Sequence, residues 1–218
     1  MRIPAPGKEE TGLLDPFEGL SLDRIVTPAT LQQFESAASE IRAEKIVGFD
    51  SESKPVFLKT TVNNGPHVVQ FATRSKAFLF QLHREEGRRL LAELLASEDV
   101  LKVGFGLGSD RSHIQNKLGV TMGALLDLNS VFSKNGYRGS TGVRAGVAIV
   151  LGRKFHKSKR VTTSNWAAAQ LDDRQRLYAA NDAYAALCVF NGLNRLRDGA
   201  LPAAAHAASI EADHGNAA

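Results

Sequence analysis

Apolar residues recur along this chain with two different periods, and each period predicts its own kind of element. In residues 30–43 apolar side chains lie three and four positions apart, and Thr30 with Gln33 resembles a capping box. A helix is therefore predicted there. Similar spacing predicts helices over 85–96 and 172–196, of which the last is the clearest.

Short apolar runs predict the strands of a sheet. The runs over 67–72 and 77–82 flank the polar turn 73–76 and are typical of a hairpin. Other short runs predict strands over 22–26, 45–49, 101–103 and 124–128. Because strands come early, helices dominate late and both alternate in the middle, the pattern favours an α/β domain with a mixed sheet.

A glycine-rich loop at 104–108 leads into a helix that we expect to begin with Ser109 as N-cap and to end at Gly119. Such a loop between strand and helix, with Asp127 further on, raises the alternative of a dinucleotide site. Its spacing is GxGxG rather than GxGxxG, and Asp110 would place a negative charge where a pyrophosphate should bind. The sequence therefore disfavours that alternative.

The two ends of the chain differ in composition from its middle. Residues 1–20 are rich in Pro, Gly and charge, and residues 199–218 are rich in alanine without apolar periodicity. Both are predicted to be tails, which leaves one folded domain over 21–198. With 43% hydrophobic and 23% charged residues in a chain of 218, a sizeable core is available, so disorder as the main state is excluded.

The cysteine content and the longest apolar stretches exclude several classes of protein. Cys188 is the only cysteine, so neither an intrachain disulfide nor a cysteine-based zinc site can form, and a reducing compartment fits best. No apolar stretch approaches the roughly 20 residues of a membrane span. Residues 1–12 lack the apolar core of a secretory signal. We therefore expect a cytoplasmic protein with no membrane partner.

Four carboxylates and one phenol are candidates for chemistry. Asp50 and Glu52 stand two apart at the end of an apolar strand, so both point to one side of the sheet. Two close carboxylates repel each other unless a cation lies between them, although solvated acids at a strand end are also common. Tyr178 and Asp182 stand four positions apart and therefore share one helix face. A buried helix with a hydrogen-bonded Asp is the alternative explanation for this pair. Asp110 lies in a first helical turn, where the dipole alone favours a carboxylate.

The order of these residues, together with their surroundings, resembles a known family. The three stretches are IVGFDSESKP, LKVGFGLGSDRSHIQ and SNWAAAQLDDRQRLYAANDAYAAL. They are similar to the motifs of the DEDDy branch of the DnaQ-like 3′-5′ exonucleases, which includes ribonuclease D and the Werner-type exonuclease domains. The resemblance covers residues 45–197 and implies a ribonuclease H-like fold, with a mixed sheet of about five strands and helices on both faces. Ser53 and Lys54 depart from the Werner-type pattern, in which a larger apolar or aromatic residue follows the glutamate.

The resemblance also implies a role for each candidate residue. Asp50, Glu52 and Asp182 would bind one divalent ion, and Asp50 with Asp110 a second, while Tyr178 would orient the attacking water. Hard oxygen ligands favour Mg²⁺ or Mn²⁺. Two such ions can activate a hydroxide, neutralise the charge of the transition state and stabilise the leaving 3′-oxygen.

The implied activity is metal-dependent 3′-5′ hydrolysis of DNA or RNA that releases 5′-mononucleotides, with DNA favoured. One alternative is an RNA-directed enzyme that trims 3′ ends as ribonuclease D does, or degrades short oligoribonucleotides. Another is a nucleic-acid-binding module with an inactive site, which the presence of all five expected residues disfavours.

The net charge of +4 is unevenly distributed along the chain. Residues 128–171 contain no Asp or Glu but carry basic residues throughout. A solvated mixed surface would interleave the two signs, so this segment favours a phosphate-backbone groove beside the carboxylates. The residues singled out for that groove are Lys154, Lys157, Lys159 and Arg160.

Overall fold

The computed structural model describes residues 3–56, 65–139 and 141–195, and within these ranges the chain forms a six-stranded mixed sheet. The strands are β1 (Ile25–Val26), β2 (Ile46–Glu52), β3 (Val68–Ala72), β4 (Ala77–Gln81), β5 (Leu101–Gly104) and β6 (Leu125–Asp127). Their order across the sheet is β1-β4-β3-β2-β5-β6. β2 pairs antiparallel with β3 and parallel with β5, so neighbouring strands hold it from both sides.

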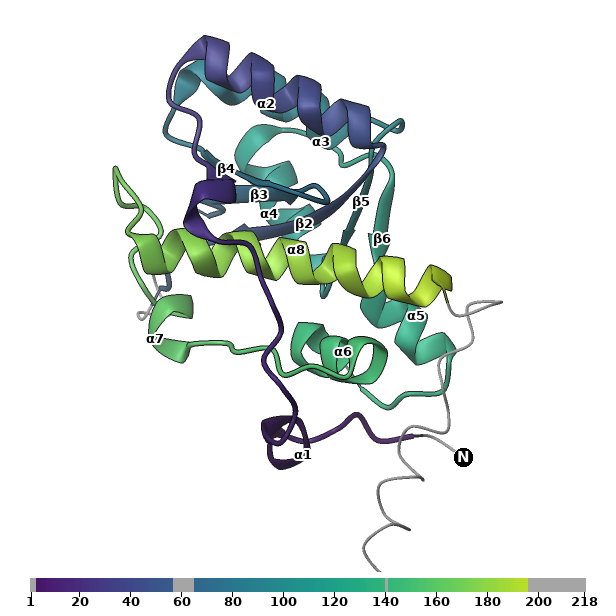
Figure 1. Cartoon of the computed structure of the whole chain (residues 1–218). Helices are drawn as coiled ribbons and strands as arrows, with labels where there is room; N and C mark the ends of the chain where they lie inside the picture. The colour runs from purple at the N-terminus through teal and green to yellow at the C-terminus, as the bar shows by residue number, and fades with distance from the viewer. Residues whose placement is uncertain (1–2, 57–64, 140, 196–218) are drawn as a thin grey trace, which may run out of the picture.

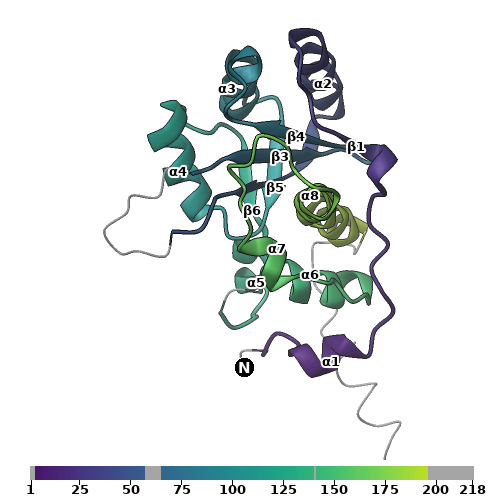
Figure 2. The same ribbon diagram turned by 90° about the vertical axis from the view of Figure 1, so that its left-hand side faces the viewer.

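Helices cover both faces of this sheet (Figures 1 and 2). α2 (Leu31–Glu44) and α3 (Arg88–Ala96) lie on one face, and the long α8 (Asp173–Arg195) lies on the other. The shorter helices are α1 (Lys8–Gly12), α4 (Gly108–Leu118), α5 (Leu128–Lys134), α6 (Gly142–Leu151) and α7 (Lys159–Thr162), with the 3-10 turns η1 (Leu22–Arg24) and η2 (Glu85–Gly87). In the described part of the chain, no helix is long and apolar enough to cross a membrane.

Alternation along β2 directs its side chains to opposite faces of the sheet. Phe49 points into the core shared with α2 and α3, whereas Gly48 faces α8. A Cβ on Gly48 would lie only 1.9 Å from the carbonyl oxygen of Ala183. The missing side chain therefore lets α8 approach the sheet closely. Asp50 and Glu52 have the same parity as Gly48, so they are directed toward α8 as well.

Replacing Gly48 by alanine is expected to destabilise the protein by about 3 kcal/mol, because the added methyl group meets the backbone of α8. Gly108→Ala is the matched control, since a Cβ there meets nothing within 4 Å. Urea unfolding of both variants measures the difference. Equal unfolding midpoints would show that α8 does not pack on β2 this closely.

Most predicted elements are confirmed. The capping box at the start of α2 is present: the backbone N–H of Gln33 donates to Thr30 Oγ1 at 3.3 Å, and the Thr30 N–H donates to Gln33 Oε1 at 3.2 Å. The hairpin becomes β3 and β4, and Gly119 ends α4 in the left-handed conformation with φ 68°. The predicted tail over 199–218 lies outside the described residues.

Three details differ from the sequence-based expectation. Only Ile25 and Val26 of the predicted strand 22–26 pair with a neighbour, because the three residues before them form the 3-10 turn η1. Ser109 is not an N-cap, since α4 already begins at Gly108. The sheet has six strands, one for each of the six predicted runs and one more than the number of about five that the resemblance implies.

The described part of the predicted N-terminal tail, residues 3–20, packs against the domain. Pro16 forms an isolated parallel β-bridge with Lys154, and the ring of Phe17 lies 5.7 Å from that of Phe155. The segment crosses the side of α8 that faces away from the sheet (Figures 1 and 2). Packed structure therefore begins before residue 21.

Candidate active site

Three carboxylates meet where the end of β2 faces α8. Asp50 and Glu52 come from the strand and Asp182 comes from the helix, and one oxygen of each lies within 4.8 Å of the others. The period-two alternation of β2 and the close approach of α8 over Gly48 bring them together. The structure thus assembles the three residues that the resemblance assigns to one metal ion.

The environment of this cluster disfavours the ionised form of its carboxyl groups. Burial raises the pKa of Asp50 well above its ordinary value, and the nearby charges of Asp182 and Asp110 raise it further. Burial and then the charge of Asp50 raise the pKa of Glu52 in the same direction. Burial also raises the pKa of Asp182, against the opposing effect of Lys157. Such a cluster gains stability from protons or from a cation.

The donor set fits a divalent cation. Both carboxylate oxygens of Asp182 are buried, and Oδ2 lies 3.0 Å from the ammonium group of Lys157. Buried carboxylate oxygens next to two further carboxylates form a hard-oxygen site of the kind that Mg²⁺ and Mn²⁺ prefer. Asp50, Glu52 and Asp182 are therefore suited to hold such an ion together.

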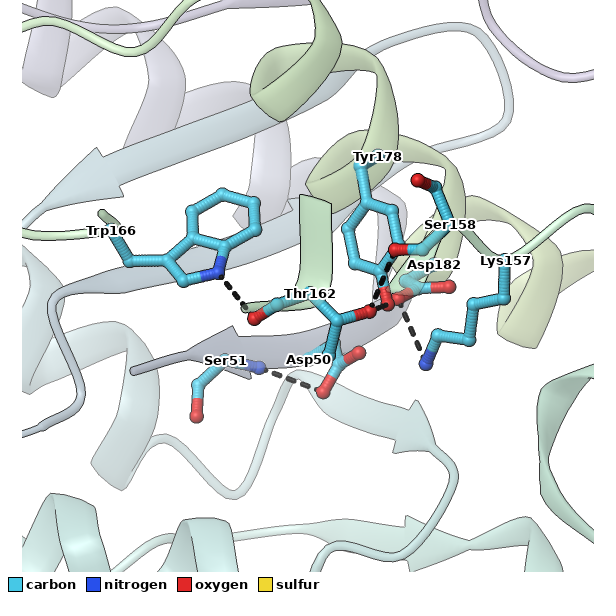
Figure 3. Close-up of polar contacts among 8 residues, drawn as sticks. All are labelled: Asp50, Ser51, Lys157, Ser158, Thr162, Trp166, Tyr178 and Asp182. Carbon is cyan, nitrogen blue, oxygen red and sulfur yellow. Dashed lines mark hydrogen bonds and ion pairs between the residues drawn. The ribbon is translucent and has the colours of Figure 1, made fainter. Parts of the chain in front are cut away.

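Lys157 contributes positive charge to the same place (Figure 3). Its Nζ lies 3.0 Å from Oδ2 of Asp182 and 5.6 Å from the centre of the Tyr178 ring. Burial alone would lower the pKa of this lysine, but the charges of Asp182 and Asp50 outweigh burial and raise it. Lys157 is therefore a permanent cation at the edge of the cluster.

Tyr178 is held by the chain segment that precedes α8 (Figure 3). Its hydroxyl lies 2.7 Å from Thr162 Oγ1, and its ring packs 5.9 Å from that of Trp166. Trp166 is itself fully buried, and its Nε1 donates to the carbonyl of Thr162 at 3.2 Å. Burial and the charge of Asp182 raise the pKa of the phenol. Tyr178 therefore stays protonated at neutral pH and presents a fixed hydroxyl beside Asp182.

Asp110 lies near the cluster but outside its compact group of three. Its carboxylate accepts a hydrogen bond from the hydroxyl of Ser51, the residue between Asp50 and Glu52. Burial raises the pKa of Asp110, while that hydrogen bond lowers it. Asp110 faces the same cleft as Asp50 and Glu52.

An open cleft of about 300 Å³ leads to these residues. Three carboxylates and Tyr178 line it together with an aromatic ring and a histidine; these residues are Asp50, Glu52, Asp110, Tyr178, Phe105 and His113. A smaller hollow of about 140 Å³ continues past Asp50 and Asp182. The cleft makes carboxylates that are otherwise largely buried accessible from solvent.

The four basic residues singled out in the sequence have different surroundings. Lys157 contacts the cluster, whereas the Nζ of Lys154 donates to the carbonyl of Gly12 at 3.0 Å. Lys159 and Arg160 are exposed on α7. Lys159 and Arg160 are therefore accessible to a phosphate in the expected groove, whereas the ammonium group of Lys154 already binds a backbone carbonyl.

Two amides of the glycine-rich loop that could bind a dinucleotide already have a partner within the chain. The backbone N–H groups of Gly106 and Leu107 both donate to the carboxylate of Asp127 at 3.0 Å. The acidic residue that would bind a ribose in that alternative instead anchors the loop. The structure therefore supports the rejection of a dinucleotide site.

Three residues near the site were not singled out from the sequence. Ser51 holds Asp110, Thr162 holds the Tyr178 hydroxyl, and the Asn181 side chain bonds to the backbone of Leu20. The alternation of β2 predicts that Ser51 points away from Asp50 and Glu52, but only the position of α4 brings Asp110 within its reach. Thr162 and Asn181 act through contacts distant in sequence, and no periodicity marks them.

The protein is thus an α/β domain with a mixed sheet and a candidate metal site of three carboxylates at the end of a central strand. The chain belongs to the 3′-5′ exonuclease family, whose model matches residues 25–197. The resemblance drawn from the three motifs is thereby confirmed.

Curated relatives with similar sequences are larger proteins. Mouse (Mus musculus) WRN, a bifunctional 3′-5′ exonuclease/ATP-dependent helicase, is 30% identical over 159 residues, which cover 70% of this chain and 11% of that protein. Exonuclease 3′-5′ domain-containing protein 2 of Drosophila melanogaster is 27% identical over 182 residues, which cover 80% of this chain and 30% of that protein. The chain thus spans less than a third of the length of these relatives.

Solved structures confirm the predicted ribonuclease H-like fold. The Nibbler EXO domain of Aedes aegypti superposes with a TM-score of 0.70 at 22% identity, covering 83% of this chain and 94% of that one. RNase D of Trypanosoma brucei gives 0.72 at 20% identity, with coverages of 82% and 66%.

Proposed function

We propose that this protein is a divalent-metal-dependent 3′-5′ exonuclease that releases 5′-mononucleotides from the 3′ end of a nucleic acid. The observation that carries the proposal is the meeting of Asp50, Glu52 and Asp182 within 4.8 Å at the end of a cleft. Membership of the 3′-5′ exonuclease family supports it.

Each residue of the site has a part in this reaction. Asp50, Glu52 and Asp182 would hold one divalent ion, and Asp50 with Asp110 a second. When bound, Mg²⁺ or Mn²⁺ supplies Lewis acidity and lowers the pKa of a bound water. The Tyr178 hydroxyl, fixed by Thr162, orients the attacking water toward the phosphorus.

Lys157 is placed to bind the phosphate that is cleaved. Its ammonium group lies at the mouth of the carboxylate cluster, with its side chain 34% exposed. There it can donate hydrogen bonds to non-bridging phosphate oxygens and neutralise part of their charge. Lys159 and Arg160 on α7 would contact phosphates further along the strand.

DNA is the favoured substrate, and RNA is the second candidate. Mouse WRN, a bifunctional 3′-5′ exonuclease/ATP-dependent helicase, is among the relatives with 30% identity, whereas a ribonuclease D of Trypanosoma brucei with the same fold has been solved in complex with RNA U12. The cytoplasmic location expected from the sequence stays a prediction.

Degradation of 5′-labelled oligonucleotides tests the proposal. Single-stranded and recessed-end duplex substrates in DNA and RNA form, with Mg²⁺ or Mn²⁺, should give a ladder of products shortened from the 3′ end. Mononucleotides carrying a 5′-phosphate should accumulate. Preferential cleavage of RNA or dinucleotides would favour the RNA-directed alternative. An absence of metal-dependent cleavage on every substrate would contradict nuclease activity and favour a binding module.

Substrate affinity is expected to fall with salt, because cations on the loop before α7 and on α7 itself bind phosphates. With about three phosphate contacts on a single strand, log K should fall with log[salt] with a slope of about −2. Fluorescence anisotropy of a labelled oligonucleotide in EDTA measures it. Arg160→Gln should make the slope shallower by about 0.7, whereas Arg42→Gln, on α2, should leave it unchanged. A slope near zero in the unmodified protein would contradict the basic groove.

A further inference from the structure

Residues 12–20, called the strap below, join two parts of the active site that are distant in sequence. The strap crosses the outer side of α8 (Figures 1 and 2). At one end, the backbone N–H of Leu20 donates to Oδ1 of Asn181 at 2.6 Å, and Nδ2 of Asn181 donates to the carbonyl of Leu20 at 3.2 Å. Asn181 immediately precedes Asp182, so the strap is tied to the helix turn that carries a carboxylate of the cluster.

At its other end the strap is tied to residues 152–158, called the lysine loop below. The backbone N–H of Lys154 donates to the carbonyl of Asp15 at 2.8 Å, and the N–H of Phe17 donates to the carbonyl of Lys154 at 2.9 Å. These two bonds pair the lysine loop with the strap as one β-bridge.

Side chains reinforce this pairing. Arg153 forms an ion pair with Asp15 at 3.0 Å, and the Nζ of Lys154 donates to the carbonyl of Gly12 at 3.0 Å. The buried ring of Phe155 packs against Phe17. The strap therefore fixes three consecutive residues of the lysine loop, and Lys157 follows two positions later.

We propose that the strap, through Asn181 and the lysine loop, positions Lys157 against Asp182. The strap is bonded close to both partners of the Lys157–Asp182 ion pair, to Asn181 next to Asp182 and to Lys154 in the loop that leads to Lys157. A lysine has a long side chain with many rotamers, so its ammonium group is placed only if its backbone is held. The strap lies outside the family match of residues 25–197. The proposal rests on the proposed function, in which Lys157 binds the phosphate.

Gly19 offers a selective way to release the strap. A Cβ at Gly19 would lie 2.4 Å from Oδ1 and 2.7 Å from Cγ of Asn181. The Asn181 amide must then move, which breaks its two bonds to Leu20. Gly12→Ala is the matched control within the strap, because a Cβ there meets nothing within 4 Å.

Hydrogen exchange followed by mass spectrometry tests the tie without requiring nuclease activity. In Gly19→Ala, the peptide that covers the lysine loop should exchange about tenfold faster, since the Lys154 amide loses its fixed acceptor. In Gly12→Ala the exchange should match that of the unmodified protein. Unchanged exchange in Gly19→Ala would overturn the proposal. If Gly19→Ala does not fold, Asn181→Ala removes the same two hydrogen bonds without a steric conflict and takes its place.

A double-mutant cycle tests whether the strap acts through Lys157. The affinity for a single-stranded oligonucleotide in EDTA should fall about fivefold in Gly19→Ala, and about as much in Lys157→Gln. If the strap positions Lys157, the double variant should bind no more weakly than Lys157→Gln alone. Additive losses would show that the strap stabilises the fold generally, and would overturn the proposal. A protein that binds and exchanges as expected but cleaves nothing would contradict the proposed function only.

Discussion

Asp182→Asn is expected to lower the rate of 3′-terminal nucleotide release by about three orders of magnitude, because it removes one of three carboxylates that together would hold a divalent ion. The fold should survive, since the substitution keeps the shape of a buried side chain and reduces the repulsion that acts on Asp50. Single-turnover kinetics on a 5′-labelled oligonucleotide at saturating Mg²⁺ or Mn²⁺ measures the rate. Circular dichroism and thermal unfolding check the fold.

Asp173→Asn is the matched control for this variant. Asp173 lies on the same helix, but its side chain is 69% exposed and pairs only with Arg176 among the described residues. Its replacement should leave the rate within about twofold, as expected for a surface position. Appreciable metal-dependent cleavage by Asp182→Asn, or an equal loss in Asp173→Asn, would contradict the site assignment.

The metal-free protein is expected to lose stability as the pH rises, and a divalent ion is expected to restore it. The pKa values of Asp50 and Glu52 are raised in the folded state by burial and mutual repulsion. The folded protein therefore keeps protons that the unfolded chain releases above about pH 4. The stabilisation is full below that pH and is lost as the pH rises through the raised pKa values of the folded state.

Thermal unfolding between pH 5 and 8, with EDTA or with added Mg²⁺ or Mn²⁺, measures this effect. At 100 times its Kd, the ion should add about 2.7 kcal/mol to the free energy of unfolding at pH 8, or roughly 5–10 °C in Tm. At pH 5 the gain should be much smaller, because protons compete for the same oxygens. Asp50→Asn should flatten the pH dependence and remove the gain. A Tm in EDTA that does not change with pH would contradict the prediction that ionised carboxylates in the cluster destabilise the metal-free protein.

Local patterns in the sequence were sufficient to predict most of the fold and to single out the candidate residues of the cluster. The period of two in β2 places Asp50 and Glu52 on one side of the sheet, and the period of 3.6 in α8 places Tyr178 beside Asp182. Both statements depend only on the geometry of a single element. The family resemblance supplied the missing step, which is that the strand and the helix meet.

Contacts between distant segments were not accessible in this way. Nothing in the periodicity of residues 12–20 indicates that they pair with Lys154, because a β-bridge with one partner needs no alternating pattern. The role of Ser51 depends on the position of α4, and the role of Thr162 depends on the path of an irregular segment. The basic segment was predicted to form one groove. In the structure, Lys157 contacts the carboxylate cluster, Lys154 contacts the strap, and Lys159 and Arg160 are exposed on α7.

The close packing of α8 on β2 over Gly48 has a consequence for the order in which function is lost on unfolding. Asp182 and Asp50 lie on elements that pack on each other through Gly48, so the cluster should open only when the whole cooperative unit opens. The lysine loop and the strap are held mainly at the surface and should open in a separate, lower-energy event. The affinity for nucleic acid should therefore fall at a lower denaturant concentration than the one that abolishes binding of the metal ion.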